Sequence, residues 1–307
     1  MLGYAVRRIG GTVPTLLILV TLSFFVIRLA PGGPFEEEHA LAPQVRANLD
    51  HLYGLDRPLG IQYLHYLDGL AHGDLGFSYE LRDESVAGLM AQGLPVSAEV
   101  GFAALVLAML GGVPLGIWAA LRRGGAVDYA VTALATLAIA LPAFVTGPML
   151  ALLFGLALRW LPVAGWQPGD PVYLILPAVT LALPVGAAIA RMMRGSLLET
   201  SGASFVRTAR ARGLGPWRVL RRHALRPALL PVVSYLGPAA TYVFTGSLVV
   251  ETVFALPGTG RYLVEGALDR DYTLVMGMIV LYGALTLFCN LAADLLYGWL
   301  DPRVRHE

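Results

Sequence analysis

The sequence predicts an all-α integral membrane protein with six transmembrane helices and a small external subdomain after the first helix. Three observations lead to this fold class. Only 14% of the 307 residues are charged, whereas a soluble globular chain carries about 25%. Hydrophobic residues make up 56%, and the mean hydropathy is +0.65. Six uncharged apolar runs are close to or above the roughly 20 residues that a helix needs to cross a bilayer.

The six runs are the predicted spans Ile9–Ile27, Val100–Leu121, Tyr129–Leu158, Val172–Ala190, Pro227–Val250 and Tyr272–Ala293. The third is long for one straight crossing, so we expect it to be tilted, kinked at Pro142 or Pro148, or partly outside the bilayer. Prolines also interrupt the second, fourth and fifth runs, at Pro114, Pro177, Pro184, Pro231 and Pro238. Because lipid cannot satisfy the freed carbonyls, these helices are expected to face other helices or a cavity.

The distribution of the arginines predicts the orientation of the chain in the membrane. With the N-terminus inside, the inner segments hold 15 of the 22 arginines but only four acids, Asp128, Glu199, Asp301 and Glu307. The outer segments then hold seven arginines and 16 acids. Basic residues collect on the cytoplasmic side of membrane proteins. We therefore expect a multi-pass protein with both termini in the cytoplasm.

The first outer segment, residues 31–98, is polar and acidic. It is expected to form a small external subdomain that contains an amphipathic helix. The residues on the apolar face of this helix are predicted to be Ile61, Leu64, Leu67 and Leu70, with Tyr63 and Tyr66 beside them.

Four of the six histidines lie in the same segment, at His39, His51, His65 and His72. A metal site, for example for nickel, is one interpretation of this cluster. The histidines lack a ligand spacing such as i, i+4, which favours four exposed histidines instead.

The largest inner segment, residues 191–226, carries nine arginines. Two short helices are predicted within it. The first runs from Phe205 to Arg212, with Ser204 as its N-cap and Gly213 at the C′ position. The second begins at Pro216, after a tight turn over residues 213–215.

Three binding partners are considered for this basic segment. Anionic lipid would be attracted by the arginines alone, and the scarcity of aromatic residues argues against nucleic acid. A cytoplasmic protein would explain the small residues between the arginines, because small side chains let another backbone come close. Composition alone leaves membrane lipid and a protein partner equally open.

The chain contains no lysine, since all 22 basic residues are arginine. A P-loop needs a lysine on the phosphates, so the chain has no Walker A site. If ATP powers its activity, another subunit must hydrolyse it. The single cysteine, Cys289, excludes a disulfide framework within the chain and a cysteine-based metal cluster.

The basic segment also carries a specific resemblance. Residues 205–214, FVRTARARGL, resemble the cytoplasmic signature of the permeases of ATP-binding-cassette (ABC) importers, and residues 221–231, RRHALRPALLP, resemble the dipeptide/oligopeptide/nickel branch of that family. The general signature has Glu-Ala-Ala, a glycine and a late proline. This chain departs from it at the first and last of these positions, Arg207 and Arg226, in the way that is typical of the branch.

Further motifs resemble the same branch along essentially the whole chain. They are Met1–Tyr4 with Arg7 and Arg8, Arg28–Gly32, Tyr53–Leu59, Gln62-Tyr63, Gly73–Gly76, Val250–Phe254, Pro257–Gly260 and Asp301–Arg303. The resemblance implies a type I ABC importer permease fold in a prokaryotic inner membrane. Three parts are expected: residues 1–30 with the first helix, the external subdomain 31–98, and a five-helix core, 99–307, that includes the coupling loop 191–226.

The resemblance also implies a function and partners. The chain would form half of the pore, usually in a heterodimer with a second permease subunit. Two ABC ATPase subunits would bind ATP and Mg²⁺, and an extracytoplasmic substrate-binding protein would deliver the substrate. This chain would then need no cofactor and catalyse no reaction. Short peptides (dipeptides or oligopeptides) are the substrates most often implied, while nickel, glutathione or another small solute is the alternative within the branch.

The residues that match the signature are expected to dock on the ATPases. They are Arg207, Thr208, Ala209, Arg210, Ala211, Arg212, Gly213 and Leu214. Gly213 would permit the sharp turn, the alanines would allow close packing, and the arginines would make charge-assisted contacts. The alternative explanation of the arginines is the inside-positive bias by itself.

Five residues near the outer end of the fifth span are candidates for the pore mouth or for a binding-protein contact: Glu251, Pro257, Gly258, Gly260 and Arg261. Glu251 is an acid at the membrane edge, where ionisable groups are functional candidates. Pairing with Arg261 and plain interfacial exposure are its alternatives. The run 257–260 is expected to form a turn.

A secondary transporter driven by an ion gradient is the rival class. It would need intramembrane carboxylates or histidines and inverted repeats, but the centres of the six spans carry no charge. A membrane enzyme would need a convergent cluster of catalytic groups at one membrane face, and the sequence indicates none. We therefore assign no catalytic, cofactor-binding or metal-binding residues.

Overall fold

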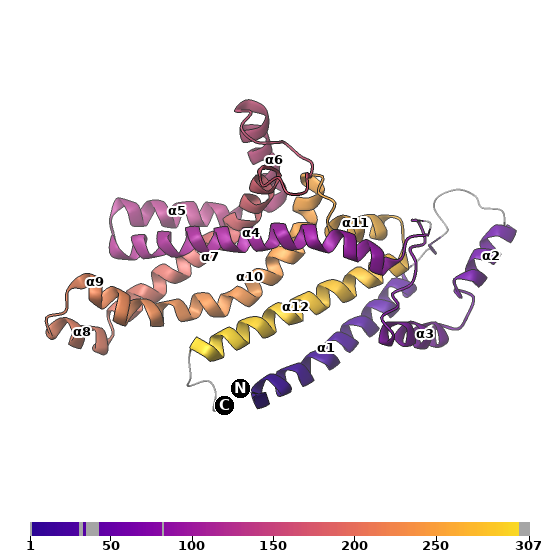
Figure 1. Ribbon diagram of the computed structural model, residues 1–307, viewed down its shortest axis with the longest axis horizontal. Helices are drawn as coiled ribbons and strands as arrows, with labels where there is room; N and C mark the ends of the chain where they lie inside the picture. The colour runs from indigo at the N-terminus through magenta and orange to yellow at the C-terminus, as the bar shows by residue number, and fades with distance from the viewer. Residues whose placement is uncertain (1, 31–32, 35–42, 82, 301–307) are drawn as a thin grey trace. The chain divides into compact units, whose positions relative to one another are not determined.

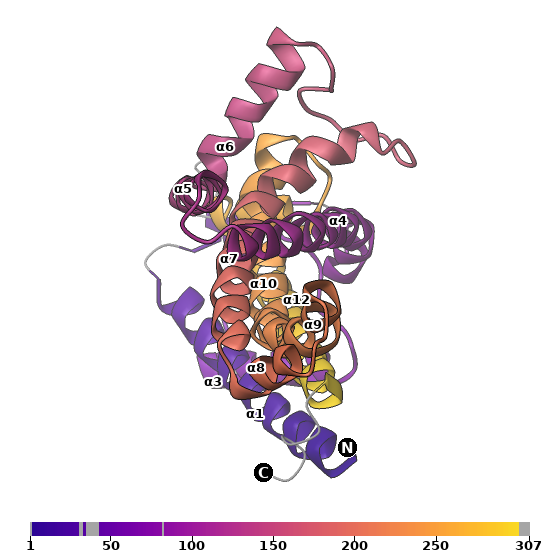
Figure 2. The same cartoon turned by 90° about the vertical axis from the view of Figure 1, so that its left-hand side faces the viewer.

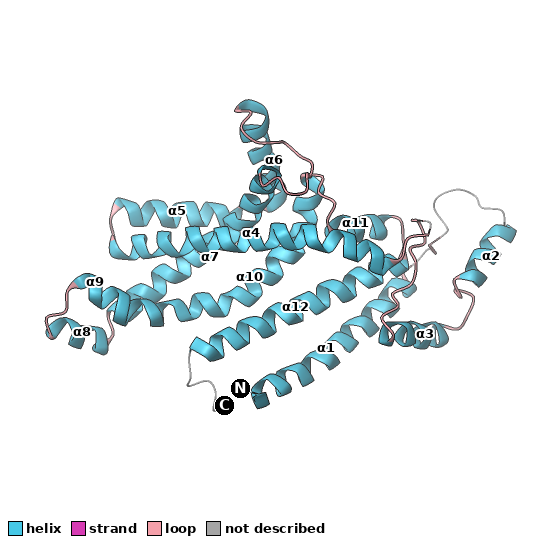
Figure 3. Cartoon of the chain, in the orientation of Figure 1, coloured by secondary structure: helices cyan, strands magenta, loops and turns pink. Residues whose placement is uncertain are grey.

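The computed structural model describes residues 2–30, 33–34, 43–81 and 83–300 (Figure 1). His39, residues 31–32 of the opening motif and the closing Asp301–Arg303 therefore lie outside the described residues. Within them the chain is helical with connecting loops (Figure 3), and its one β pairing is an isolated bridge between Phe77 and Ser85.

The described elements follow one another along the chain. They are α1 (Leu2–Leu29), α2 (Pro43–Leu52), α3 (Leu59–Ala71), α4 (Val86–Leu121), α5 (Ala126–Ala140), α6 (Ala143–Leu150), the π-helical η1 (Ala151–Ala157), α7 (Val172–Ser201), α8 (Ser204–Ala211), α9 (Pro216–Val219), the π-helical η2 (Leu220–Ala224), α10 (Leu225–Val253), α11 (Thr259–Leu268) and α12 (Tyr272–Leu300).

The predicted spans correspond to helices of suitable length and composition. Five described helices are long and apolar enough to cross a membrane, and the bent pair α5 and α6–η1 would make six. The bend is 107°, and it falls at Leu141 and Pro142, so the predicted kink at Pro142 is confirmed. Pro148 lies inside α6 without a break.

The helix that contains the fifth predicted span begins before that span does. The second helix of the basic segment continues through Pro227, so that α9, η2 and α10 form one helical stretch from Pro216 to Val253. The π-helical η2 ends at Ala224, and Pro227 follows in the first turn of α10.

The chain divides into two compact units. The first comprises residues 1–10, 97–256 and 285–307. In it α7 packs against α5, α6 and α10, and Figures 1 and 2 both show α7 beside α10. Helix α4 approaches α7 through glycine: a Cβ on Gly112 would lie 2.5 Å from the carbonyl oxygen of Gly186, and one on Gly116 would lie 2.5 Å from that of Ala190. Small residues allow such contacts between membrane helices, as expected for the proline-containing spans.

The second unit comprises residues 11–96 and 257–284. Its core joins α1 and α12 through the buried side chains of Val20, Phe24 and Met276. The predicted amphipathic helix is α3, and it covers this core with a face that differs from the predicted one. Tyr63, Tyr66, Leu67 and Leu70 pack inwards, whereas Ile61 and Leu64 are 49% and 66% exposed.

Helix α4 is longer than the second predicted span, Val100–Leu121. Helix α4 begins at Val86, so the expected boundary at residue 98 lies well inside a helix of 36 residues. Val86 and Leu89 are buried against Leu274 and Met278 of α12. This packing makes the first turns of α4 part of the second unit.

Candidate functional site

The basic segment forms a helix with a well-defined end. In α8 the amide of Gly213 donates to the carbonyl of Arg210 at 2.9 Å, and the amide of Leu214 donates to that of Ala209 at 3.4 Å. These two bonds are the Schellman pattern, which needs a left-handed residue at C′. Gly213 has φ +74°, so its predicted C′ position is confirmed.

The start of α8 differs from the prediction by one residue. The N-cap is Ala203, with extended backbone and no side-chain hydrogen bond. Ser204 is the first helical residue, and its carbonyl accepts a bond from the Thr208 hydroxyl at 3.0 Å. The predicted cap at Ser204 is therefore wrong. Pro216, in contrast, stands in the first turn of α9, as predicted.

The two faces of α8 have different surroundings. Val206 is fully buried and Ala209 is 5% exposed, because α8 packs against α7, α9 and η2 (Figure 2). Ala209 is thus covered by its own chain and Leu214 is half-buried, so the expectation that Ala209 packs against a partner needs correction. The remaining matched residues are exposed: Arg207, Thr208, Arg210, Ala211, Arg212 and Gly213.

No ion pair forms between the three signature arginines, Arg207, Arg210 and Arg212, and any other described residue of the chain. Two aromatic side chains are exposed on the same helix pair, Phe205 at 47% and Trp217 at 65%. The segment therefore presents both positive charge and apolar surface to its surroundings.

An ion pair with a buried carboxylate supports the helix that leads into α8. The Arg194 guanidinium of α7 pairs with the Asp128 carboxylate of α5 through two hydrogen bonds, from Nε to Oδ1 and from Nη2 to Oδ2. The amide of Gly124 also donates to Oδ2, at 2.9 Å. Because Asp128 is only 4% exposed, this network fastens the 122–125 turn to α7.

The candidate mouth residues have unequal exposure. Glu251 is fully buried, so plain interfacial exposure is wrong for this acid. Arg261 pairs with Glu265 of its own helix at 2.6 Å. Gly258 is the N-cap of α11 and Gly260 is buried within its first turn, whereas Pro257 is exposed. The run 257–260 is therefore mainly a helix start, and the turn precedes it at Ala255, which has φ +52°.

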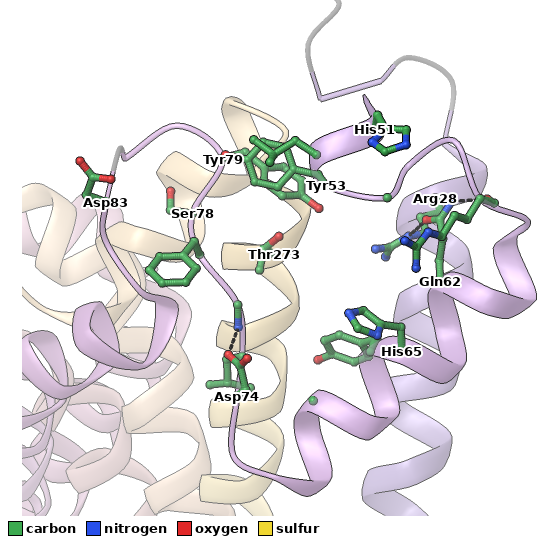
Figure 4. A pocket seen from close by; sticks show the side chains of 18 residues that line it. Arg28, His51, Tyr53, Gln62, His65, Asp74, Ser78, Tyr79, Asp83 and Thr273 are labelled. Atoms are coloured by element: carbon green, nitrogen blue, oxygen red, sulfur yellow. Dashed lines mark hydrogen bonds between the residues drawn. The ribbon is translucent and has the colours of Figure 1, made fainter. Parts of the chain in front are cut away.

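A cavity of about 710 Å³ lies within the second unit (Figure 4). Its walls come from the end of α1, from α3 and from the loop that precedes α4, and they include Arg28, Tyr66, Asp74 and Tyr79. Two of the predicted histidines, His51 and His65, also line it. Within the described residues no group of three metal-ligating side chains is found.

The loop wall of the cavity is fixed by a buried acid that the sequence analysis missed. The Asp271 carboxylate accepts hydrogen bonds from the Ser78 hydroxyl at 2.5 Å and from the Tyr79 amide at 2.8 Å. Asp271 is 1% exposed and lies 193 residues from Ser78 along the chain. A single carboxylate before an apolar span gives no sequence signal of this kind, because the pairing depends on the tertiary fold.

Apolar helices long enough to cross a membrane, with an exposed arginine-rich helix pair between two of them, define an integral membrane protein with a basic segment outside its spans. The chain belongs to the family of binding-protein-dependent transport system inner membrane components. The model of this family matches residues 112–306, and that of its N-terminal part matches residues 1–97. The predicted membership of the ABC-importer permeases is confirmed.

Individual relatives match over the full length. The chain is 48% identical to the oligopeptide transport system permease protein OppB of Escherichia coli (strain K12), over 306 residues and 100% of both chains. It is 40% identical to the dipeptide transport system permease protein DppB of Bacillus subtilis (strain 168), over 99% of this chain and 98% of the relative.

A solved structure shares the fold. A chain from the inward-facing MetNI methionine ABC transporter superposes with a TM-score of 0.58 and 19% sequence identity, covering 69% of this chain and 96% of that one. The predicted type I ABC importer permease fold is therefore confirmed for this part of the chain.

Proposed function

We propose that this chain forms half of the translocation pore of an ABC importer for short peptides. A substrate-binding protein outside the membrane delivers the peptide, and a second permease subunit completes the pore. Two ABC ATPases bind ATP and Mg²⁺ and drive alternating access. The choice of peptides rests on the relatives, which are named for oligopeptide and dipeptide transport.

The proposed coupling to the ATPases rests on one observation, the exposed basic face of α8. Its arginines make no ion pair within the described chain, and guanidinium groups bind carboxylates and carbonyls of a partner through charge-assisted hydrogen bonds. A helix that lies on lipid presents a large apolar face, whereas α8 exposes a single large apolar side chain, Phe205, among its arginines and buries Val206 inside the chain. We therefore favour the ATPases over membrane lipid as the partner of this face.

The second part of the proposal concerns the candidate mouth residues and the binding protein. Exposed Pro257 and Arg261 are assigned to contact with the binding protein. Glu251, Gly258 and Gly260 are buried, so they are not assigned to this contact and stay candidates for the pore mouth. Neither group is assigned a catalytic task, since the hydrolysis of ATP takes place in the partner subunits.

Reconstitution tests the energy source. The purified chain alone should not accumulate a labelled tripeptide in vesicles under a proton or sodium gradient. The complex with the second permease, both ATPases and the binding protein should import the tripeptide when ATP is supplied. Gradient-driven accumulation by the chain alone would contradict the proposal and indicate a secondary transporter. Import of nickel but not of tripeptide would contradict the peptide assignment.

The proposed orientation has its own test, in a Cys289→Ser background. A cysteine at Asp68, whose side chain is 73% exposed, should react in intact cells with a thiol reagent that cannot cross the membrane. A cysteine at exposed Ala211 should react only after the cells are permeabilised. The reverse pattern would place both termini outside.

A further inference from the structure

A row of arginines runs along the helical stretch that follows α8. Arg218, Arg222 and Arg226, here called the arginine row, stand four residues apart in α9, η2 and α10, and all three are exposed. Side chains at this spacing lie one above the other on the same side of a helix. The neighbouring pair Trp217 and Arg221 has the same spacing, and the guanidinium carbon lies 6.0 Å from the ring centre. Figure 1 shows the stretch running from α9 into α10, within the first unit.

The described chain does not neutralise the arginine row. None of its three members forms an ion pair with another described residue, and the sequence contains no acid between Glu199 and Glu251. The row cannot turn inwards, because Val219, Leu220 and Ala224 on the other side of the helix are buried against the chain. Like charges four residues apart repel each other and destabilise a helix. An anion that lies along the row would remove this cost.

The position of the arginine row favours an anion of the membrane surface. Arg226 immediately precedes the predicted span Pro227–Val250, and Arg222 stands one turn further out, about 6 Å at 1.5 Å per residue. The polar layer on each side of the hydrocarbon core is roughly 5–8 Å deep. Both arginines therefore fall within the layer that contains the lipid phosphates. Helical side chains point towards the N-terminus, which here is the direction away from the hydrocarbon.

We propose that the arginine row binds the phosphate groups of anionic membrane lipid, chiefly through Arg222 and Arg226. Guanidinium groups bind phosphate oxygens through paired, charge-assisted hydrogen bonds, and anionic lipid attracts basic residues next to a span. Helix α8 differs from this stretch, because it does not itself continue into a span, and its arginines remain assigned to the ATPases. Bound lipid would hold the start of α10 at a fixed depth in the membrane.

Lipid binding by the purified full-length chain tests the arginine row. The chain in dodecylmaltoside micelles is titrated with fluorescently labelled phosphatidylglycerol or phosphatidylcholine. The wild type should bind phosphatidylglycerol more tightly than phosphatidylcholine, and the double variant Arg222→Gln/Arg226→Gln should weaken phosphatidylglycerol binding about fivefold or more. Lysine at both positions keeps the charge and should retain most of the affinity. Unchanged binding by the glutamine variant would overturn the proposal.

A matched control removes the same charge elsewhere. Arg122 and Arg123 are exposed in the turn between α4 and α5, which Figure 1 shows at the same end of the first unit as α9. They are adjacent in the sequence and do not form a row along a helix. Arg122→Gln/Arg123→Gln should bind phosphatidylglycerol as tightly as the wild type. Equal weakening by both double variants would indicate a general effect of positive charge and overturn the specific site.

Thermal unfolding separates loss of the ligand from damage to the fold. In nanodiscs of phosphatidylcholine, Arg222→Gln/Arg226→Gln should melt at the wild-type temperature or above it, because the repulsion along the row is removed. Phosphatidylglycerol should raise the melting temperature of the wild type by about 2 °C or more and leave that of the variant unchanged. A variant that melts below the wild type in phosphatidylcholine would show that the row supports the fold, and would overturn the proposal.

Two other occupants of the row are distinguished by the same variants. Both ATPases should copurify with Arg222→Gln/Arg226→Gln as they do with the wild type; their loss, with phosphatidylglycerol binding unchanged, would assign the row to the ATPases. Soluble glycerol phosphate that competes as well as phosphatidylglycerol would overturn the assignment to lipid. The binding measurements use the chain alone, so their outcome does not depend on which solute the complete complex transports.

Discussion

Alanine at Arg207, Arg210 and Arg212 together is expected to reduce the ATP hydrolysis stimulated by loaded binding protein about tenfold or more. One exposed ion pair contributes only about 0–1 kcal/mol, so each single change should have a small effect. Removing three such pairs at once adds up to the roughly 1.4 kcal/mol that corresponds to a factor of ten. The measurement is phosphate release by the reconstituted complex, with and without binding protein and peptide.

The control for this triple variant removes positive charge from a different place on the same predicted side of the membrane. Arg122 and Arg123 are exposed in the turn between α4 and α5, on the same predicted side of the membrane. Their double alanine variant should retain wild-type stimulation. The contradicting outcome is a complex with the triple variant that is present at wild-type abundance and shows normal stimulation of ATP hydrolysis by loaded binding protein. In that case α8 is not the coupling element, and its arginines reflect only the inside-positive bias.

Leucine at Gly112 is expected to lower the yield of folded protein severely, and the melting temperature by about 5 °C or more. The Cβ alone would lie 2.5 Å from a backbone oxygen of α7 and 2.9 Å from the side chain of Ile189. The two helices must therefore separate, and overpacking of a tight contact costs about 1–3 kcal/mol or more. A shift of 1 kcal/mol corresponds to about 2–4 °C in a domain of 150–250 residues.

The neighbouring glycine supplies a matched control. Gly111 stands on the same helix, but nothing lies within 4 Å of its Cβ position. Gly111→Leu should therefore be purified in wild-type amounts with an unchanged melting temperature. Equal damage from both variants would show that flexibility of the glycine pair, and not close approach to α7, explains their presence.

The sequence predicted those features that depend on local or compositional signals. Apolar runs located the membrane helices, Pro142 located the bend, and Gly213 located the end of α8. Each of these follows from a property of a few neighbouring residues: hydropathy, the missing amide of proline, or the freedom of glycine at positive φ.

Features that depend on tertiary packing were not predictable in the same way. The inward face of α3 is chosen by Phe24 and Met276, which are distant in sequence. Helix α4 begins at Val86 because α12 covers its first turns. The cavity requires Arg28, Tyr66 and the loop before α4 to come together, and the matched motifs containing Arg28 and Asp74 gave no indication that these residues share one site.

The short connections around α8 have a mechanical consequence. Only Gly202 and Ala203 separate α7 from α8, and two residues extend over at most about 7 Å. On the other side, residues 212–215 lead into the continuous helical stretch that ends at Val253. With so little slack, a displacement of α8 is transmitted to α7 and α10 at the same time. Since these two helices pack against each other, they should move together when a partner displaces α8.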